Sequence, residues 1–124
     1  MHVAITGGTT GIGAKVVSKL KNQGHQVTVF DFIEITQSVD EFVHLDLSNN
    51  TSIEEALKNT NGPFDALINN AGIPPRENTE QKILMVNYIG MKTFLDGMID
   101  KLNRGAAILN TSSRAGSMWQ ENLK

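Results

Sequence analysis

A glycine-rich stretch near the start of the chain has residue types and spacing suited to binding phosphate. It reads TGGTTGIG over residues 6–13, follows a short apolar run and precedes a segment with helical periodicity. Glycines in such a turn let the backbone approach a pyrophosphate closely, and a helix that begins there directs N–H groups and the positive end of its dipole at the phosphates. Alone the signal is weak, because an ordinary strand-to-helix turn is also often rich in glycine.

An acidic residue strengthens this interpretation. Asp31 ends the second apolar run, about 20 residues beyond the glycines, where a carboxylate can accept hydrogen bonds from both ribose hydroxyls of an adenosine and repel a 2′-phosphate. The next residue is Phe32 and not a cation, so the sequence favours NAD over NADP. In isolation, Asp31 would be an ordinary solvated residue at a strand end.

The elements that must position these residues alternate along the chain. We expect strands at 2–6, 26–31, 42–47, 64–69 and 106–113, and helices at 13–22, 51–59 and 80–102. Gly24 should stop the first helix, and Thr51 with Glu54 should form a capping box at the start of the second. The alternation predicts one α/β domain over residues 1–124, a doubly wound Rossmann fold with a parallel sheet of about five strands in the order 3-2-1-4-5.

Composition excludes several other classes. Eleven basic against 13 acidic residues and a net charge of −2 argue against a nucleic-acid or anionic-membrane surface. No apolar window of about 18 residues predicts a membrane span, and the first residues do not resemble a signal peptide, so we expect a cytoplasmic protein. The three histidines share no ligand spacing and there is no cysteine, so no metal site is expected.

Taken in order, five motifs resemble those of the short-chain dehydrogenase/reductase family. They are the Thr-Gly-x3-Gly-x-Gly loop at 6–13, HLDLS at 44–48, NNAG at 69–72, VNYIG at 86–90 and ILNTSSRAG at 108–116. The resemblance implies an NAD(P)-dependent oxidoreductase that interconverts an alcohol and a ketone by hydride transfer. The cofactor contacts that it implies are Thr6, Gly7, Gly8, Thr10, Gly11, Ile12, Gly13, Asp31, Asp46, Leu47, Asn70, Ala71 and Gly72.

The same resemblance implies two catalytic residues. Ser113 corresponds to the serine that orients the substrate oxygen, and Asn87 to the asparagine that helps hold a proton-relay water. The family's Tyr-x3-Lys pair follows the serine, but no tyrosine follows Ser113 here. Tyr88 and Lys92 have the same spacing but precede the serine, so we expect Tyr88 to pack under the sheet and Lys92 to point into solvent.

These features predict the N-terminal half of a short-chain dehydrogenase, inactive as 124 residues alone. A catalytically silent NAD(H)-binding module and a structural fragment are the alternatives. The short interval between Gly72 and Asn87 resembles the compact bacterial 3α-hydroxysteroid dehydrogenase/carbonyl reductase branch. We also expect self-association, either through the apolar strand AAILN at 106–110 or through the 80–102 helix.

Overall fold

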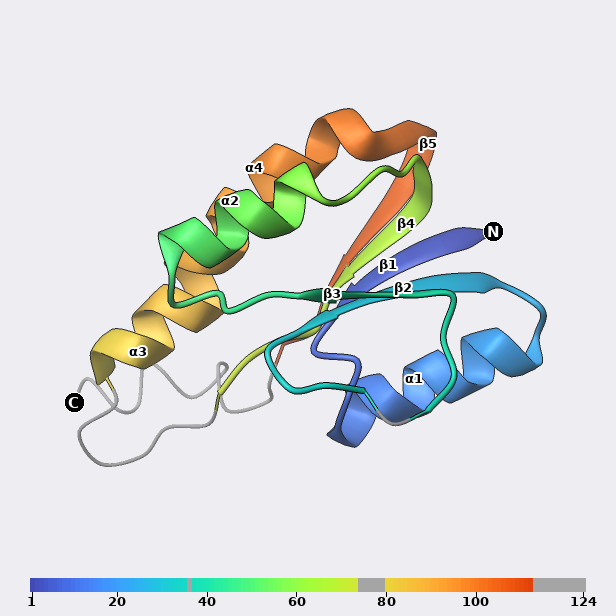
Figure 1. Cartoon of the computed structure of the whole chain (residues 1–124), viewed down its shortest axis with the longest axis horizontal. Helices are drawn as coiled ribbons and strands as arrows, with labels where there is room; N and C mark the ends of the chain where they lie inside the picture. The colour runs from blue at the N-terminus through green and yellow to red at the C-terminus, as the bar shows by residue number, and fades with distance from the viewer. Residues whose placement is uncertain (36, 74–79, 113–124) are drawn as a thin grey trace.

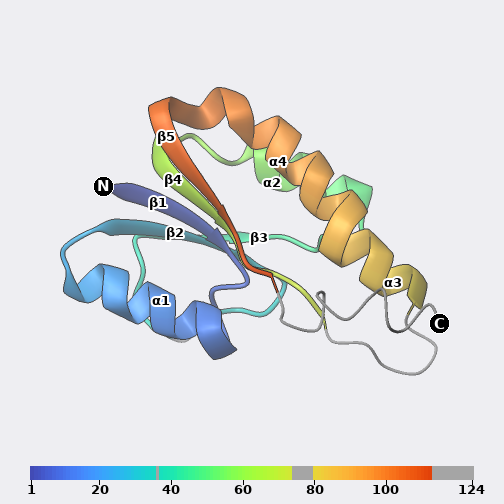
Figure 2. The ribbon, with the colours of Figure 1, turned by 180° about the vertical axis from the view of Figure 1, so that it is seen from behind.

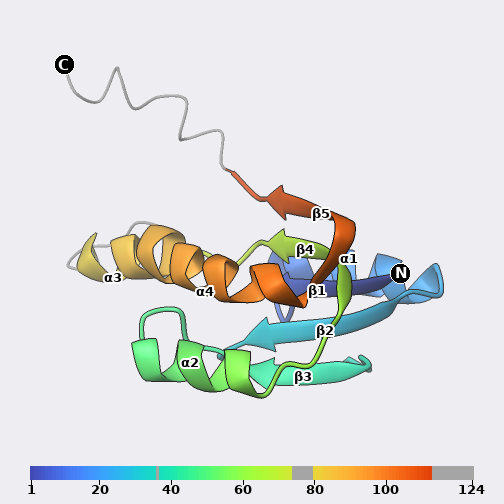
Figure 3. The same cartoon turned by 90° about the horizontal axis from the view of Figure 1, so that it is seen from above.

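The computed structural model describes residues 1–35, 37–73 and 80–112, which form a parallel sheet with helices on both faces (Figure 1). The strands are β1 (His2–Thr6), β2 (Gln26–Asp31), β3 (Glu41–His44), β4 (Phe64–Asn69) and β5 (Leu102–Asn110). Their order, β3-β2-β1-β4-β5, is the predicted one, and every neighbouring pair is parallel (Figure 3). Both the fold class and the strand order are therefore confirmed.

The helices lie on the two faces of this sheet. They are α1 (Gly11–Asn22), α2 (Asn50–Lys58), α3 (Glu80–Leu84), the π-helical turn η1 (Met85–Gly90), α4 (Met91–Met98) and the 3-10 turn η2 (Ile99–Lys101). Figure 2 shows α1 on one side of the strands and α2, α3 and α4 on the other. Among the described residues, no helix has the length and apolar character needed to cross a bilayer.

Two apolar cores form because the central strands are buried on both faces. On the α1 face, Val17 packs against Ile5 and Val29. On the opposite face, Phe94 of α4 meets Phe30 of β2 edge-on, with ring centroids 5.0 Å apart. These cores fix the sheet and bring the carboxyl ends of its strands together at one edge.

Several element boundaries differ from the predicted ones. Strand β3 ends at His44, which makes the last pairing with Asp31 of β2. Leu45 and Leu47 continue the alternating pattern and pack into the core beyond this pairing. The predicted capping box is wrong: Asn49 caps α2 by accepting a hydrogen bond from the Ser52 N–H at 3.0 Å. Gly24 does end the first helix region with a positive φ of 84°, as expected.

The segment predicted as one helix over 80–102 is instead three joined helical pieces and a short 3-10 turn. The π-helical turn lies at Met85–Gly90, and the chain already enters β5 at Leu102. Gly90 is buried against the Leu47 carbonyl oxygen, where a Cβ atom would overlap that oxygen. The close approach holds this helical segment against the loop after β3.

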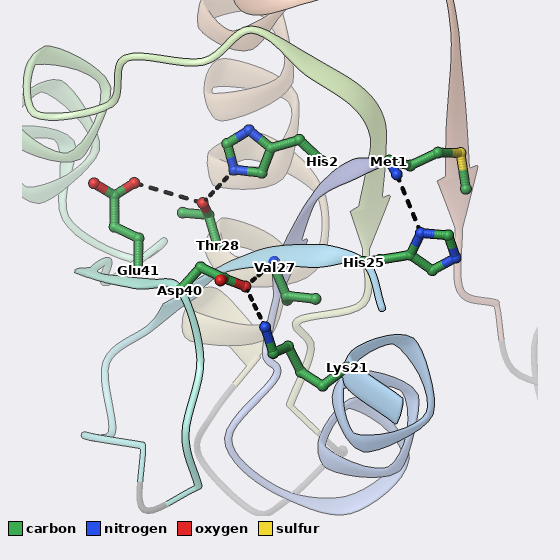
Figure 4. A network of polar contacts seen from close by, with 8 residues as sticks. All are labelled: Met1, His2, Lys21, His25, Val27, Thr28, Asp40 and Glu41. Atoms are coloured by element: carbon green, nitrogen blue, oxygen red, sulfur yellow. Dashed lines mark hydrogen bonds and ion pairs between the residues drawn. The ribbon is translucent and has the colours of Figure 1, made fainter. Parts of the chain in front are cut away.

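A polar network at the amino ends of β1 and β2 ties α1 to the sheet (Figure 4). One carboxylate oxygen of Asp40 accepts hydrogen bonds from Lys21 Nζ and from the Val27 N–H, both at 2.7 Å. The Lys21 hydrogen bond, followed by that from Val27, lowers the pKa of Asp40. Asp40 thereby joins α1, β2 and the segment that leads into β3.

We expect Asp40→Asn to weaken the dependence of the free energy of unfolding on pH in the acidic range. Because the native pKa of Asp40 is depressed, its stabilisation is present above the pKa of the unfolded chain and is lost as pH falls through the native pKa. The ion pair is about one-third exposed, so solvent screening limits the loss at pH 7 to about 1 kcal/mol or less. Urea unfolding across the acidic range measures the effect.

Asp96→Asn is the matched control. Asp96 faces Lys92 at 4.0 Å on the exposed side of α4, and its loss should leave the pH dependence nearly unchanged. An unchanged pH dependence in the acidic range for Asp40→Asn would contradict the assignment.

Candidate functional site

A cavity of about 670 Å³ opens at the carboxyl ends of the strands. It is built by the loops after β1, β2, β3 and β4, with the helical segment after residue 80 closing one wall. The lining residues are Gly7, Thr10, Ile12, Phe30, Asp31, Phe32, Ile33, Leu45, Asp46, Leu47, Asn70, Ala71, Gly72, Ile73, Lys82, Val86 and Thr111.

Most of the predicted cofactor contacts line this one cavity. They come from four separate strand ends, and they are Gly7, Thr10, Ile12, Asp31, Asp46, Leu47, Asn70, Ala71 and Gly72. The other predicted contacts are absent from the cavity lining: Thr6 ends β1, Gly8 lies in the loop after it, and Gly11 and Gly13 lie in the first turn of α1. Ser113 lies outside the described residues.

The glycines of the loop permit close backbone packing. Gly7 has a φ of 69°, and a Cβ there would lie 2.8 Å from Ala71 Cα. A Cβ on Gly13 would overlap the Gly7 carbonyl oxygen and come within 2.6 Å of Asn70 Nδ2. Gly8 is buried against Val17, so its small size serves the core of the α1 face. The loop after β1 and the loop after β4 therefore interlock.

The amino end of α1 is open to an anion. Within the described residues no side chain caps this helix, since Thr10 occupies the N-cap position without a side-chain hydrogen bond, and its first turn contains no acidic residue. By contrast, the Asn49 side chain occupies the equivalent position of α2. First-turn N–H groups have no partner inside a helix, so those of α1 are available to a negatively charged group.

The carboxylate of Asp31 is held rigidly at the end of β2. Oδ2 accepts from the Thr9 N–H at 3.1 Å and Oδ1 from the Ile33 N–H at 3.3 Å. The residue is only 7% exposed, yet it lines the cavity. Each oxygen has a further lone pair, so this carboxylate can still accept hydrogen bonds from hydroxyl groups.

A second carboxylate lines the same cavity. Asp46 Oδ1 accepts hydrogen bonds from the Ser48 hydroxyl at 2.6 Å and the Ser48 N–H at 2.9 Å. The Ser48 hydroxyl is the largest cause of a lowered Asp46 pKa, and the charges of Lys82 and His44 act in the same direction. Asp46 is therefore ionised at neutral pH and can accept from an amino group.

Thr6 links the loops after β1 and β4. Its hydroxyl oxygen accepts from the Asn70 N–H at 3.1 Å and from the Ala71 N–H at 3.0 Å, and the residue is 2% exposed. The threonine therefore positions the NNAG segment and is not part of the cavity wall.

We expect Thr6→Val to lower the free energy of unfolding by about 1–3 kcal/mol, because both N–H groups lose their acceptor in a buried setting. Thr6→Ser keeps the hydroxyl and should lose less. Urea denaturation of the two variants separates the hydrogen bonds from the packing of the methyl group, and equal losses would contradict the role of the hydroxyl.

Asn87 joins η1 to the segment after β4. Its Oδ1 accepts from the Ile73 N–H at 2.9 Å and its Nδ2 donates to the Ile73 carbonyl at 3.1 Å. The side chain is thus bonded to the backbone at the cavity wall, and no contact tests its predicted role with a water molecule.

The Tyr88–Lys92 pair does not line the cavity. The expectation that Tyr88 packs under the sheet is wrong, since it is 58% exposed on η1. Lys92 faces solvent, as predicted, and pairs with Asp96. The described part of the chain also holds no group of three His, Asp or Glu side chains suited to a metal ion.

Asparagines connect the ends of β4 and β5. Asn69 Nδ2 donates to Asn110 Oδ1 at 3.0 Å. Asn69 Oδ1 is buried without a partner in the described structure. Asn70 Nδ2 does donate to a backbone group, the Gly7 carbonyl, at 3.1 Å.

Sequence reasoning missed part of the cavity wall. Phe32 and Ile33 directly follow Asp31, and Ile73 follows the NNAG motif, so their positions in the sequence could have indicated them. Lys82 and Val86 reach the cavity only because the helical segment folds across it, and no local pattern signals that contact.

Comparison with known proteins identifies relatives of the chain. The family model for short chain dehydrogenases matches residues 1–123. A coniferyl-alcohol dehydrogenase from Pseudomonas sp. strain HR199 is 31% identical over 122 residues, which cover 98% of this chain and 48% of that protein. The chain thus spans about half the length of the curated relatives it matches.

Two solved structures share the fold of this chain. A short chain dehydrogenase from Leptospira borgpetersenii with bound NAD+ superposes with a TM-score of 0.79 at 27% identity, covering 94% of this chain and 52% of that one. The 3-alpha-hydroxysteroid dehydrogenase from Pseudomonas sp. B-0831, complexed with NADH, gives 0.73 at 28% identity, with coverages of 94% and 50%.

Proposed function

The chain belongs to the short-chain dehydrogenase family, and on this premise we propose that residues 1–124 form the NAD-binding part of an oxidoreductase. The proposed reaction interconverts an alcohol and a carbonyl compound by hydride transfer. One observation carries the proposal: the open amino end of α1 and the carboxylates of Asp31 and Asp46 converge on one cavity. The named relatives differ in their alcohols, so the proposal stops at this substrate class.

The residues present fit a nicotinamide dinucleotide. The first-turn N–H groups of α1 would hold the pyrophosphate, and Asp31 would accept from the adenosine ribose hydroxyls. Asp46 would accept from the adenine amino group, and the Asn70–Gly72 segment would lie beside the second ribose. When bound, the nicotinamide supplies the hydride acceptor or donor.

NAD is the preferred form in this proposal. Asp31 is held by two backbone N–H groups and cannot swing away from an incoming 2′-phosphate without losing both bonds. Its negative charge would repel that phosphate in the partly buried site, where electrostatic interactions are stronger than in water.

The catalytic groups of the 124 residues are incomplete in this proposal. Ser113 would orient the substrate oxygen, and Asn87 would support the proton path. The chain's only tyrosine is Tyr88, which lies outside the cavity wall. We therefore propose that the 124-residue chain alone binds NAD(H) and does not turn over an alcohol. The interconversion of alcohol and carbonyl compound is proposed at the level of the family.

A titration with NADH, NADPH and AMP tests the proposal. Saturable NADH binding, weaker NADPH binding and displacement of NADH by AMP are the expected results, read from nicotinamide fluorescence. A silent binding module gives the same binding but leaves no activity in any longer form of the protein. Failure of NADH and AMP to bind would leave only the structural-fragment alternative.

Self-association of this chain is part of the proposal. At the sheet edge, Ile108 and Leu109 of β5 are 41% and 51% exposed, and Leu84 and Tyr88 are exposed on the helical segment. An uncovered edge strand with apolar side chains favours pairing between chains. Light scattering of the eluted protein should show a species larger than the monomer, and a monomer at high concentration would refute the proposal.

A further inference from the structure

The end of β5 is bonded to the phosphate loop through one amide side chain. The Thr111 hydroxyl donates to Asn70 Oδ1 at 3.1 Å, and Asn70 Nδ2 donates to the Gly7 carbonyl at 3.1 Å. Three strand ends, those of β1, β4 and β5, therefore meet at Asn70. The Thr111 N–H separately donates to the Asn69 carbonyl at 3.0 Å, which continues the sheet pairing.

The direction of these hydrogen bonds fixes the amide. The Gly7 carbonyl can only accept, so the NH2 group of Asn70 must face it and Oδ1 must face Thr111. The Thr111 hydroxyl therefore donates. An amide that accepts on one side and donates on the other is polarised, which strengthens both bonds. Loss of the hydroxyl would leave Oδ1 without its donor and the amide held only by its bond to the Gly7 carbonyl.

The Gly7 carbonyl lies beside the first turn of α1. Gly13 packs so closely on that carbonyl that a Cβ would overlap it, and the same Cβ would be 2.6 Å from Asn70 Nδ2. If the first turn of α1 shifts when a phosphate binds, it must therefore displace the Asn70 amide. This close packing leaves no space for the helix end and the amide to move independently.

We propose that Thr111 is a positioning residue that couples nucleotide occupancy of the phosphate loop to the end of β5. This coupling rests on the proposed nucleotide site. Thr111 lies on the cavity wall, and Ser113 follows it by two positions in the chain. An occupied loop would hold Gly7 and Asn70 in place, and Thr111 would transmit that order to the end of β5.

Backbone-amide NMR of the 124-residue chain, titrated with ADP, tests this coupling. In the unaltered chain, ADP should shift the resonances of Gly13 in α1 and of Asn110 at the end of β5. In Thr111→Val, the Gly13 shift should remain, the Asn110 shift should vanish, and ADP affinity should fall roughly two- to tenfold for one lost hydrogen bond. Thr111→Ser keeps the hydroxyl and should restore the Asn110 shift and the ADP affinity.

The matched control is Thr93→Val, which removes an exposed hydroxyl bonded to the Ile89 carbonyl on the helical segment. It should leave both shifts intact. Persistence of the Asn110 shift in Thr111→Val at saturating ADP would overturn the coupling while leaving the nucleotide site standing. Absence of the Gly13 shift in the unaltered chain would overturn the proposed function, and the coupling with it.

Discussion

Gly13→Ala should greatly weaken dinucleotide binding and leave a chain that is still folded. The added Cβ would overlap the Gly7 carbonyl oxygen and lie within 2.6 Å of Asn70 Nδ2. Neither neighbour can retreat cheaply, since one is backbone and the other is fixed by its bond to that same carbonyl. The first turn of α1 must move outward, which displaces the N–H groups proposed to hold the pyrophosphate. We expect NADH affinity to fall by about a hundredfold or more, which is the loss of one or two charge-assisted hydrogen bonds.

The stability of Gly13→Ala should fall by about 1–3 kcal/mol, as is usual for overpacking, less the gain in helix propensity from alanine. Calorimetric titration with NADH and urea unfolding measure the two effects separately.

Gly97→Ala is the matched control for this substitution. Gly97 is also inside a helix, α4, and a Cβ there would overlap the Leu57 side chain of α2. The clash is with the end of a side chain and lies outside the cavity wall. This variant should lose stability and keep its NADH affinity. Equal losses of affinity in the two variants would show that Gly13 acts only through global stability.

The parts of the site that end a strand or directly follow one were predictable from the sequence. The glycine loop follows β1 directly and Asp31 ends β2, and parallel strands place such ends at the same edge of the sheet. The sheet order followed from the alternation of strands and helices. The cap at Asn49 was not predicted, because Thr51 with Glu54 forms a competing local capping pattern in the sequence.

The helical segment after residue 80 shows why the remainder was missed. A π-helical turn at Met85–Gly90 contains extra residues per turn, and each inserted residue rotates the rest of the helix by about 100°. A constant period of 3.6 therefore cannot assign the buried face of this segment, in which Tyr88 is exposed and Phe94 is fully buried. Lys82 and Val86 reach the cavity through tertiary packing alone.

Asp31→Asn should reverse or erase the preference for NADH over NADPH. The substitution removes the negative charge that faces the 2′ position in the proposed complex, and it replaces one acceptor oxygen by an NH2 group. NADH should bind more weakly, because hydrogen bonds from the ribose hydroxyls lose their charged acceptor, and NADPH should bind more tightly. The ratio of the two affinities should change by about 10- to 100-fold.

Part of the effect of Asp31→Asn will be structural. The Thr9 and Ile33 N–H groups each donate to one carboxylate oxygen, so an asparagine must present its NH2 group to one of them. Stability should fall by about 1–3 kcal/mol for this unmatched donor. That loss acts equally on both dinucleotides, and the affinity ratio is therefore the informative quantity.

Asp46→Asn is the matched control, because it removes a negative charge from the cavity at a position that is proposed not to face the ribose. Asp46 lies in the same cavity wall but is proposed to face the adenine, which NADH and NADPH share. This variant should weaken the two dinucleotides by the same factor and leave their ratio unchanged. If Asp31→Asn also weakened both equally, the carboxylate of Asp31 would not be the group that reads the 2′ position, and the proposed NAD preference would fail while the phosphate loop remained.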